Sequence, residues 1–128
     1  MLRAFKRLLR PGGRIAYTNI FVSPELTASQ RRRARRSGPR AVASRSDQCQ
    51  LLASAGFIDI DMYDLTAEFA CTARAWIAGW AANEHELARL ETPETFAERQ
   101  RDRHRQLRAI EQGLLRRALF SATRPRPT

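Results

Sequence analysis

Three titratable side chains between residues 63 and 85 have the chemistry of a general base. Tyr63 and Asp64 are neighbours near the end of a predicted strand, and His85 lies further along the sequence. Each could take a proton from a hydroxyl or amine nucleophile. The sequence identifies no partner that would perturb their pKa values, so a structural or solvated role is the favoured interpretation for each. Asp64 and His85 are therefore only weak catalytic candidates.

The cysteines and histidines do not form a metal-binding pattern. Cys49 and Cys71 are not in a CxxC pair, and neither His85 nor His104 has a neighbouring cysteine that would complete a ligand set. We therefore expect no metal site. Both cysteines are expected to be reduced and buried as small hydrophobic side chains.

An aromatic stripe could form the wall of an apolar pocket. Phe69, Trp76 and Trp80 recur, with Ala73 and Ile77, at the spacing of one helical face. Such a face can line a substrate cavity. It can equally pack into a core, because aromatic stripes on helices are ordinarily buried. Both interpretations are open, and the three aromatic residues are candidate substrate-binding residues.

Three segments that could position these residues have the composition of β-strands. Residues 14–22 are rich in β-branched and aromatic types and end shortly before a proline. Residues 57–65 alternate, which predicts Ile58 and Met62 on the same face. Residues 114–123 are predicted to form a third strand. It ends there because the proline-rich residues that follow cannot continue pairing in a sheet.

Helical periodicity precedes and separates these strands. Residues 2–9 have it, and a Pro-Gly-Gly turn ends that helix. A further helix is predicted to begin at a cap residue, Ser44 or Ser46, and to end at Gly56. Two more helices are predicted between the second strand and the third, one from residue 66 onward and one over roughly residues 93–112.

This alternation predicts an α/β fold with helices packed on a sheet. In an open α/β sheet, ligands bind beyond the carboxyl ends of the strands. The candidate substrate-binding residues at those ends are Thr18, Asn19, Phe21 and Thr66. Ordinary strand-end residues are the alternative interpretation. The helical segment between the last two strands would arch over the same edge, beside these residues.

The chain is strongly basic, with a formal net charge of +10. Its arginine run, residues 31–36, could be a mobile loop or a short solvated helix. Such charge could contact nucleic acid or an acidic protein. However, every basic residue except Lys6 is arginine, a skew that a GC-rich genome can produce, and no aromatic residues interrupt the run. A basic nucleic-acid-binding or protein-interaction module is therefore the alternative interpretation, and nucleic acid is not the expected partner.

The composition suits one soluble, globular unit. Hydrophobic residues make up 43% of the 128 residues, which is enough for a packed core. No apolar run approaches the roughly 20 residues that span a bilayer, and the N-terminal residues lack a signal-peptide apolar region. We expect a cytoplasmic protein with no membrane span.

Four segments resemble junctions of a known enzyme family. Residues 7–16, RLLRPGGRIA, resemble the junction that leads into the fifth strand of class I S-adenosylmethionine-dependent methyltransferases. Residues 51–57, LLASAGF, are similar to the step from helix into the sixth strand of that family. Residues 64–66 resemble the step after that strand, and residues 114–125 resemble the final antiparallel strand.

The resemblance implies the C-terminal half of a Rossmann-like methyltransferase sheet. That half has about three strands, the last antiparallel, with packed helices and a helical insert before the last strand. By this resemblance, residues 1–128 form one partial domain. It consists of a helix-strand-loop-helix-strand unit (1–64), an insert or cap (65–112) and a final strand with its tail (113–128). Family members with such an insert methylate small, often lipophilic metabolites, with S-adenosylmethionine as methyl donor.

The resemblance also implies that no cofactor-binding residues lie in this chain. The Gly-rich loop, the ribose-binding acidic residue and the fourth-strand motif of the family all precede the matched region. Gly12-Gly13 is no substitute, because a phosphate-binding loop follows a strand and opens a helix, whereas these glycines precede a strand. We therefore expect a truncated enzyme that is inactive alone. The unpaired edge of its first strand could pair with a second copy in a homo-oligomer.

Overall fold

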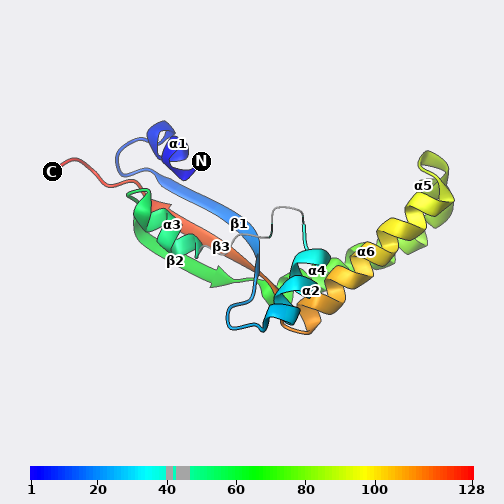
Figure 1. The fold of residues 1–128 in the computed structure, drawn as a ribbon. Helices are drawn as coiled ribbons and strands as arrows, with labels where there is room; N and C mark the ends of the chain where they lie inside the picture. The colour runs from blue at the N-terminus through cyan, green and yellow to red at the C-terminus, as the bar shows by residue number, and fades with distance from the viewer. Residues whose placement is uncertain (40–41, 43–46) are drawn as a thin grey trace.

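A three-stranded sheet and the helices packed on it form the structure, a computed structural model that describes residues 1–39, 42 and 47–128 (Figure 1). In chain order the elements are α1 (Leu2–Leu8), β1 (Arg14–Val22), α2 (Ala28–Ser37), α3 (Gln48–Ser54), β2 (Ile58–Asp64), α4 (Thr66–Ala82), α5 (Glu84–Leu90), α6 (Pro93–Glu111) and β3 (Leu115–Thr123). The predicted α/β class and the helical segment before the last strand are confirmed. That segment holds three helices rather than two, because the helical conformation is interrupted at Asn83, between α4 and α5.

The last strand in the sequence is the central strand of the sheet. The order is β1-β3-β2, and β3 runs antiparallel to both neighbours, as the resemblance implied. Its pairing with β1 is continuous from Arg14 opposite Thr123 to Val22 opposite Leu115. Within the described residues, β1 and β2 therefore form the two outer edges of the sheet.

Strand β2 is less regular than its alternating sequence predicts. Ile58 pairs with Thr123 and Asp61 pairs with Ser121, so β2 carries one extra residue between these pairs. Asp59 lies there with a φ of 49° in the left-handed region. A bulge of this kind shifts the following residues to the opposite face. Ile58 and Met62 therefore do not share a face, which corrects the predicted alternation.

Helix α3 begins and ends with local capping contacts. The predicted cap residues, Ser44 and Ser46, lie outside the described residues, and the side chain of Asp47 caps the helix by accepting the Cys49 N–H at 2.8 Å. At the other end, Gly56 has a φ of +91°, and the N–H of Phe57 donates to the Leu52 carbonyl at 3.0 Å. This is a Schellman motif.

The arginine run belongs to a regular helix, α2, rather than to a loop. Thr27 and Gln30 form a reciprocal capping box at its start, which satisfies backbone donors that would otherwise lack partners. Ala34, in the middle of the run, is completely buried. Arg32, Arg33 and Arg36 are exposed, because only one side of the helix packs on the protein, whereas Arg31 and Arg35 are half-buried.

The core consists of two clusters on opposite faces of the sheet. Successive residues of a strand point to opposite faces, so β3 contributes Leu115 to one cluster and Ala118, Phe120 and Ala122 to the other. Helices α2, α4 and α6 cover the first face at the Leu115 end. Helices α1 and α3 cover the second face. Tyr17 on β1 joins this second layer, since its hydroxyl donates to Gln48 Oε1 at 2.8 Å.

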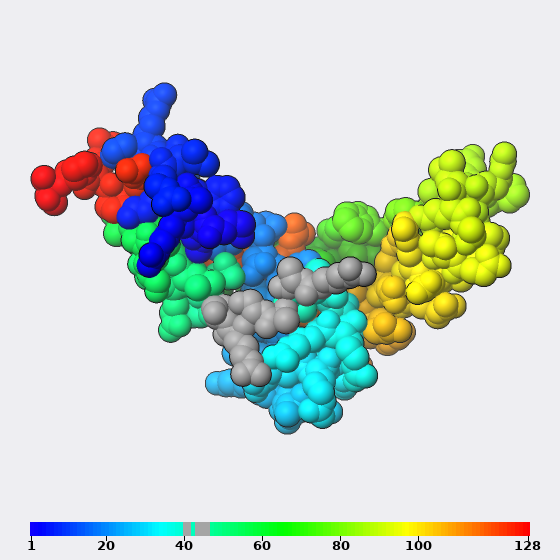
Figure 2. Space-filling model, turned by 45° about the horizontal axis from the view of Figure 1, so that its top comes forward, coloured from blue at the N-terminus to red at the C-terminus, as the bar shows by residue number. Residues whose placement is uncertain are grey.

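Helices α4, α5 and α6 form an arm that projects from the end of the sheet (Figure 1). Figure 2 shows the arm and the sheet diverging on either side of α2, with the two chain termini on the sheet side.

Cys71 on α4 is exposed and Cys49 is half-buried, so the predicted burial of both cysteines is wrong. No helix among the described residues is long and apolar enough to cross a bilayer.

Candidate functional site

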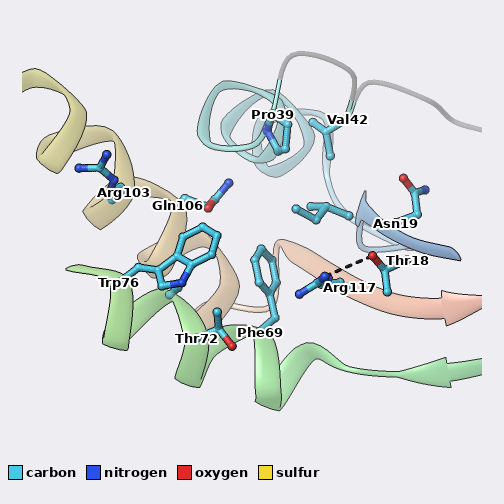
Figure 3. Close-up of a pocket in the computed structure, with 12 residues that line it drawn as sticks. Thr18, Asn19, Pro39, Val42, Phe69, Thr72, Trp76, Arg103, Gln106 and Arg117 are labelled. Carbon is cyan, nitrogen blue, oxygen red and sulfur yellow. Dashed lines mark hydrogen bonds between the residues drawn. The ribbon is translucent and has the colours of Figure 1, made fainter. Parts of the chain in front are cut away.

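A cavity of about 410 Å³ lies where the arm meets the carboxyl end of β1 (Figure 3). Its walls come from four elements and the segment after α2. These residues are Thr18, Asn19 and Ile20 from β1, Phe69, Thr72, Ala73 and Trp76 from α4, Arg103 and Gln106 from α6, Arg117 from β3, and Pro39 and Val42. The volume is within the range of small-molecule sites.

The α4 side of the cavity is apolar. Phe69 is 8% exposed and joins the core, whereas Trp76, two turns further along, is 64% exposed. Figure 3 shows both rings on the same side of the cavity. An indole with that much free surface is not simply filling a core, so the predicted aromatic stripe is packed at Phe69 and open at Trp76.

Arg117 brings a positive charge to the sheet side of the cavity. Its guanidinium donates to Thr18 Oγ1 at 3.2 Å and lies 5.8 Å from the centre of the Phe69 ring. Both contacts hold the side chain over the end of β1, as Figure 3 shows. A cation placed over an aromatic face is stabilised by the ring quadrupole, which favours this position.

Arg103 at the arm end of the cavity is held differently. Its guanidinium stacks 3.9 Å from the centre of the Trp80 ring and donates to Gln100 Oε1 at 2.9 Å. Burial, and then the neighbouring Arg99, lower the pKa of Arg103. Trp80 also packs at 6.4 Å from Phe96, so these side chains tie α4 to α6.

The structure brings four of the predicted substrate-binding residues to the cavity: Thr18, Asn19, Phe69 and Trp76. The other three do not line it. Trp80 lies in the contact between α4 and α6, and Phe21 packs against Phe120 on the opposite face of the sheet. Thr66 is used at the start of α4, where its hydroxyl donates to Asp64 Oδ1 at 2.6 Å.

Neither weak catalytic candidate lines the cavity. Asp64 Oδ1 accepts hydrogen bonds from both the hydroxyl and the backbone N–H of Thr66, and these bonds hold the pKa of Asp64 below its usual value. The carboxylate thereby satisfies one of the free N–H groups at the start of α4. His85 is exposed on α5, at the far tip of the arm (Figure 1), and Tyr63 is also exposed.

Several cavity residues were not predicted from the sequence, Arg117 above all. A signal was present, because Leu115, Arg117 and Leu119 alternate along one face of the last strand, where a charged residue between two leucines is unusual. Thr72, Arg103 and Gln106 carried no comparable signal. They are ordinary helix-surface types until α4 and α6 are packed together.

A second, strongly basic groove lies between α2 and α6. Its volume is about 460 Å³, and its charged lining consists of Arg33, Arg36, Arg105 and Arg108. Arg33 also donates to Gln112 Oε1 at 2.7 Å, and Arg105 pairs with Asp102 at 3.4 Å. Part of the arginine run therefore stabilises the packing of α2 on α6.

The described residues offer no evident metal or cofactor site. They contain no group of three or more His, Cys, Asp or Glu side chains that could hold a metal ion. None of the described cavity residues is acidic, so no carboxylate is placed to accept hydrogen bonds from a ribose. In the Gly12-Gly13 turn, the Gly12 N–H donates to the Arg124 carbonyl and the Gly13 carbonyl accepts from the Arg124 N–H. These backbone groups of the turn are therefore already hydrogen-bonded within the fold.

Comparison with known proteins relates the chain to others through structure rather than sequence. No protein-family model and no curated protein sequence matches it. Phosphoethanolamine N-methyltransferase 2 from Haemonchus contortus superposes with a TM-score of 0.80 at 17% identity over 98% of this chain. The mycolic acid cyclopropane synthase CmaA1 gives 0.81 at 17% identity over 95%, and the [4+2]-cyclase SpnF gives 0.65 at 19% over 98%.

These likenesses establish the fold. The chain has the fold of the C-terminal part of class I S-adenosylmethionine-dependent methyltransferases, which confirms the resemblance read from its sequence. It spans 29% of the Haemonchus enzyme, 52% of the synthase and 43% of the cyclase. The cyclase shows that one fold can house more than one chemistry, so function has to be argued from the site.

Proposed function

We propose that this chain forms the acceptor-binding part of an S-adenosylmethionine-dependent methyltransferase that acts on a small, largely apolar metabolite. The observation that carries the proposal is the cavity between the carboxyl end of β1 and the aromatic face of α4. In open α/β sheets, that edge is where ligands bind. Phosphoethanolamine N-methyltransferase 2 was solved with S-adenosylmethionine, which supports this molecule as the methyl donor of the complete enzyme.

The walls of the cavity suit methyl transfer to such an acceptor. The reaction needs an electrophilic methyl group held in line with a nucleophile, so positioning and exclusion of water can supply much of the catalysis. Phe69 and Trp76 would hold and orient the apolar body of the acceptor. No general base is required by this arrangement, which agrees with the positions of Asp64 and His85 away from the cavity.

The 128 residues by themselves are proposed to bind the methyl donor weakly and to be inactive. They contain neither a Gly-rich loop between strand and helix nor an acidic residue at the described cavity wall. Calorimetry of the full chain with S-adenosylmethionine should give no dissociation constant tighter than about 1 mM, which corresponds to roughly −4 kcal/mol. Micromolar binding would contradict this part of the proposal.

Activity of the natural gene product tests the proposal directly. The complete protein that contains these residues, purified from its own cells by an affinity tag, is assayed with S-adenosylmethionine tritiated on its methyl group and a metabolite extract. Transfer of tritium to an organic-soluble product is expected. Thr72→Trp, which fills the cavity from α4, should abolish the transfer. Ala78→Trp, on the same helix but outside the cavity, should retain it.

Two outcomes of this assay would contradict the proposal. One is the absence of any methyl transfer by the complete protein, and the other is equal transfer by the two tryptophan variants.

The alternative of a nucleic-acid-binding or protein-interaction module is not favoured by the matched structures named above, which are a methyltransferase, a synthase and a cyclase.

A further inference from the structure

The cavity contains a guanidinium that has no carboxylate partner among the described residues. Arg117 is half-buried, and neither ion pair formed in the described part of the chain includes it. The residues outside that part, 40–41 and 43–46, include no aspartate or glutamate. A partly desolvated charge without a partner is unfavourable, so a bound anion at this position would be stabilised.

Within the described part of the chain, the guanidinium of Arg117 donates one hydrogen bond, so most of its donors are unused there. A guanidinium carries five N–H donors in a planar fork that matches the two oxygens of a carboxylate or phosphate. The hydrogen bond to Thr18 Oγ1 and the position over Phe69 fix the plane of the group. Figure 3 shows the guanidinium between Phe69 and Thr18 at the sheet side of the cavity. The fork is thereby held in place before a ligand arrives, which reduces the entropy lost on binding.

Arg103 does not serve the same role. Its guanidinium is stacked on Trp80 and hydrogen-bonded to Gln100, and it also lies in the field of Glu91 and Asp102. Figure 3 shows it at the far end of the cavity, turned away from Phe69 and Trp76. As far as the described lining residues go, the cavity is therefore polarised, with one available cation at the sheet and an aromatic wall along α4.

We propose that the acceptor bound in this cavity is an amphipathic oxyanion, whose carboxylate or phosphate group binds Arg117 and whose apolar body lies on Phe69 and Trp76. The inference rests on the proposed function, because it assigns the substrate class of the same cavity. A carboxylate and a phosphate each present two oxygens that can accept a pair of parallel hydrogen bonds from the guanidinium.

Binding of four probes with the same hydrocarbon body tests the inference. They are 4-phenylbutyrate, 4-phenylbutyl phosphate, 4-phenylbutan-1-ol and 4-phenylbutylamine. The reporter is the full chain with Trp80→Phe, in which Trp76 is the sole tryptophan and its fluorescence responds to occupancy of the cavity. At least one of the two anions should bind about tenfold or more tightly than the alcohol, as expected for a hydrogen bond to a charged group, and the amine should bind most weakly.

Substitution of the arginine isolates its contribution. Arg117→Gln should weaken binding of the anionic probes about tenfold or more and leave the affinity for the alcohol nearly unchanged. Arg116→Gln is the matched control, because it removes the same charge from the adjacent residue, which is exposed and points to the opposite face of β3. This control should keep the preference for anions, which separates a specific contact from attraction to a basic protein.

The outcomes separate this inference from the proposed function. Binding is measured without S-adenosylmethionine, so an anion preference supports the inference even if no methyl transfer is found. A preference for the carboxylate or for the phosphate identifies the acidic group. Equal binding of anion and alcohol would overturn the inference and leave the proposed function standing. If Arg117→Gln does not fold, as judged by circular dichroism, the probe comparison on the unsubstituted arginine decides alone.

Discussion

At the scale of single residues, the chemistry of several side chains depends on what they contact. Asp64 has the chemistry of a base, yet two hydrogen bonds from Thr66 make it a helix-capping group with a lowered pKa. Trp76 and Trp80 are one turn apart on α4, yet one is open to a cavity and the other is packed between α4 and α6. Residue type alone did not separate these roles.

The capping role of Asp64 predicts a pH-dependent stability. Because the folded pKa lies below the unfolded value of about 3.9, the ionised carboxylate stabilises the fold above that value. This contribution is lost as the pH falls through the lowered pKa. Asp64→Asn should therefore lower the free energy of unfolding by about 0.5–1 kcal/mol at pH 6, a small effect since Asp64 is exposed.

Urea unfolding of the two proteins between pH 6 and pH 3 measures this effect. The difference between them should shrink toward zero at the acid end of the range. A difference that stays constant with pH would show that the charge of Asp64 does not contribute to capping.

At the scale of elements, two glycines predict opposite effects of the same substitution. Gly56 ends α3 with a φ of +91°, a backbone conformation that is strained for any residue with a Cβ. Gly79 is inside α4, and nothing lies within 4 Å of an added Cβ. Gly56→Ala should cost about 1–2 kcal/mol of stability. Gly79→Ala should add about 0.5–1 kcal/mol, because alanine loses less backbone entropy in a helix.

Urea titration of each alanine variant against the parent chain provides the measurement. The two midpoints should move in opposite directions with little change in the slope of the transition. A Gly56→Ala midpoint at or above that of the parent would show that the left-handed turn is not needed to end α3, and a lowered Gly79→Ala midpoint would contradict the gain expected inside α4.

Local sequence predicted most elements well and missed features set by their neighbours. Residues 14–22 were predicted as a strand with the bounds that β1 has, since a Pro-Gly-Gly turn and a proline delimit it. The helix over residues 93–112 also matches α6 closely. The bulge at Asp59 was not predicted, because it arises from pairing β2 with β3, which are far apart in the sequence.

At the scale of the whole molecule, the free edge of β1 predicts self-association. Only β3 pairs with β1 among the described residues, and unpaired strand edges recruit further strands. Ser23 N–H donates to the Leu114 carbonyl, so odd-numbered residues of β1 hydrogen-bond to β3 and even-numbered ones direct their N–H groups outward. Sedimentation velocity of the chain should show a dimer whose fraction rises with concentration.

One substitution at that edge tests how the copies associate. Ala16→Pro removes an outward N–H without removing a bond to β3, so it should shift the equilibrium to monomer. Ala16→Val keeps the N–H and should leave the dimer intact. A parent chain that stays monomeric at high concentration would contradict edge pairing.

Local residue patterns predicted the α/β class and the order of most elements, because they specify strands, helix ends and glycine turns. The methyltransferase fold was implied separately, by the resemblance of four segments to that family. The sequence also indicated four cavity residues, since strand ends and helix faces follow from periodicity. Only the tertiary structure placed Arg117 beside Thr18 and Phe69 and left Trp76 open. These side chains come from β1, α4 and β3, and their meeting depends on how distant elements pack, which no local pattern encodes.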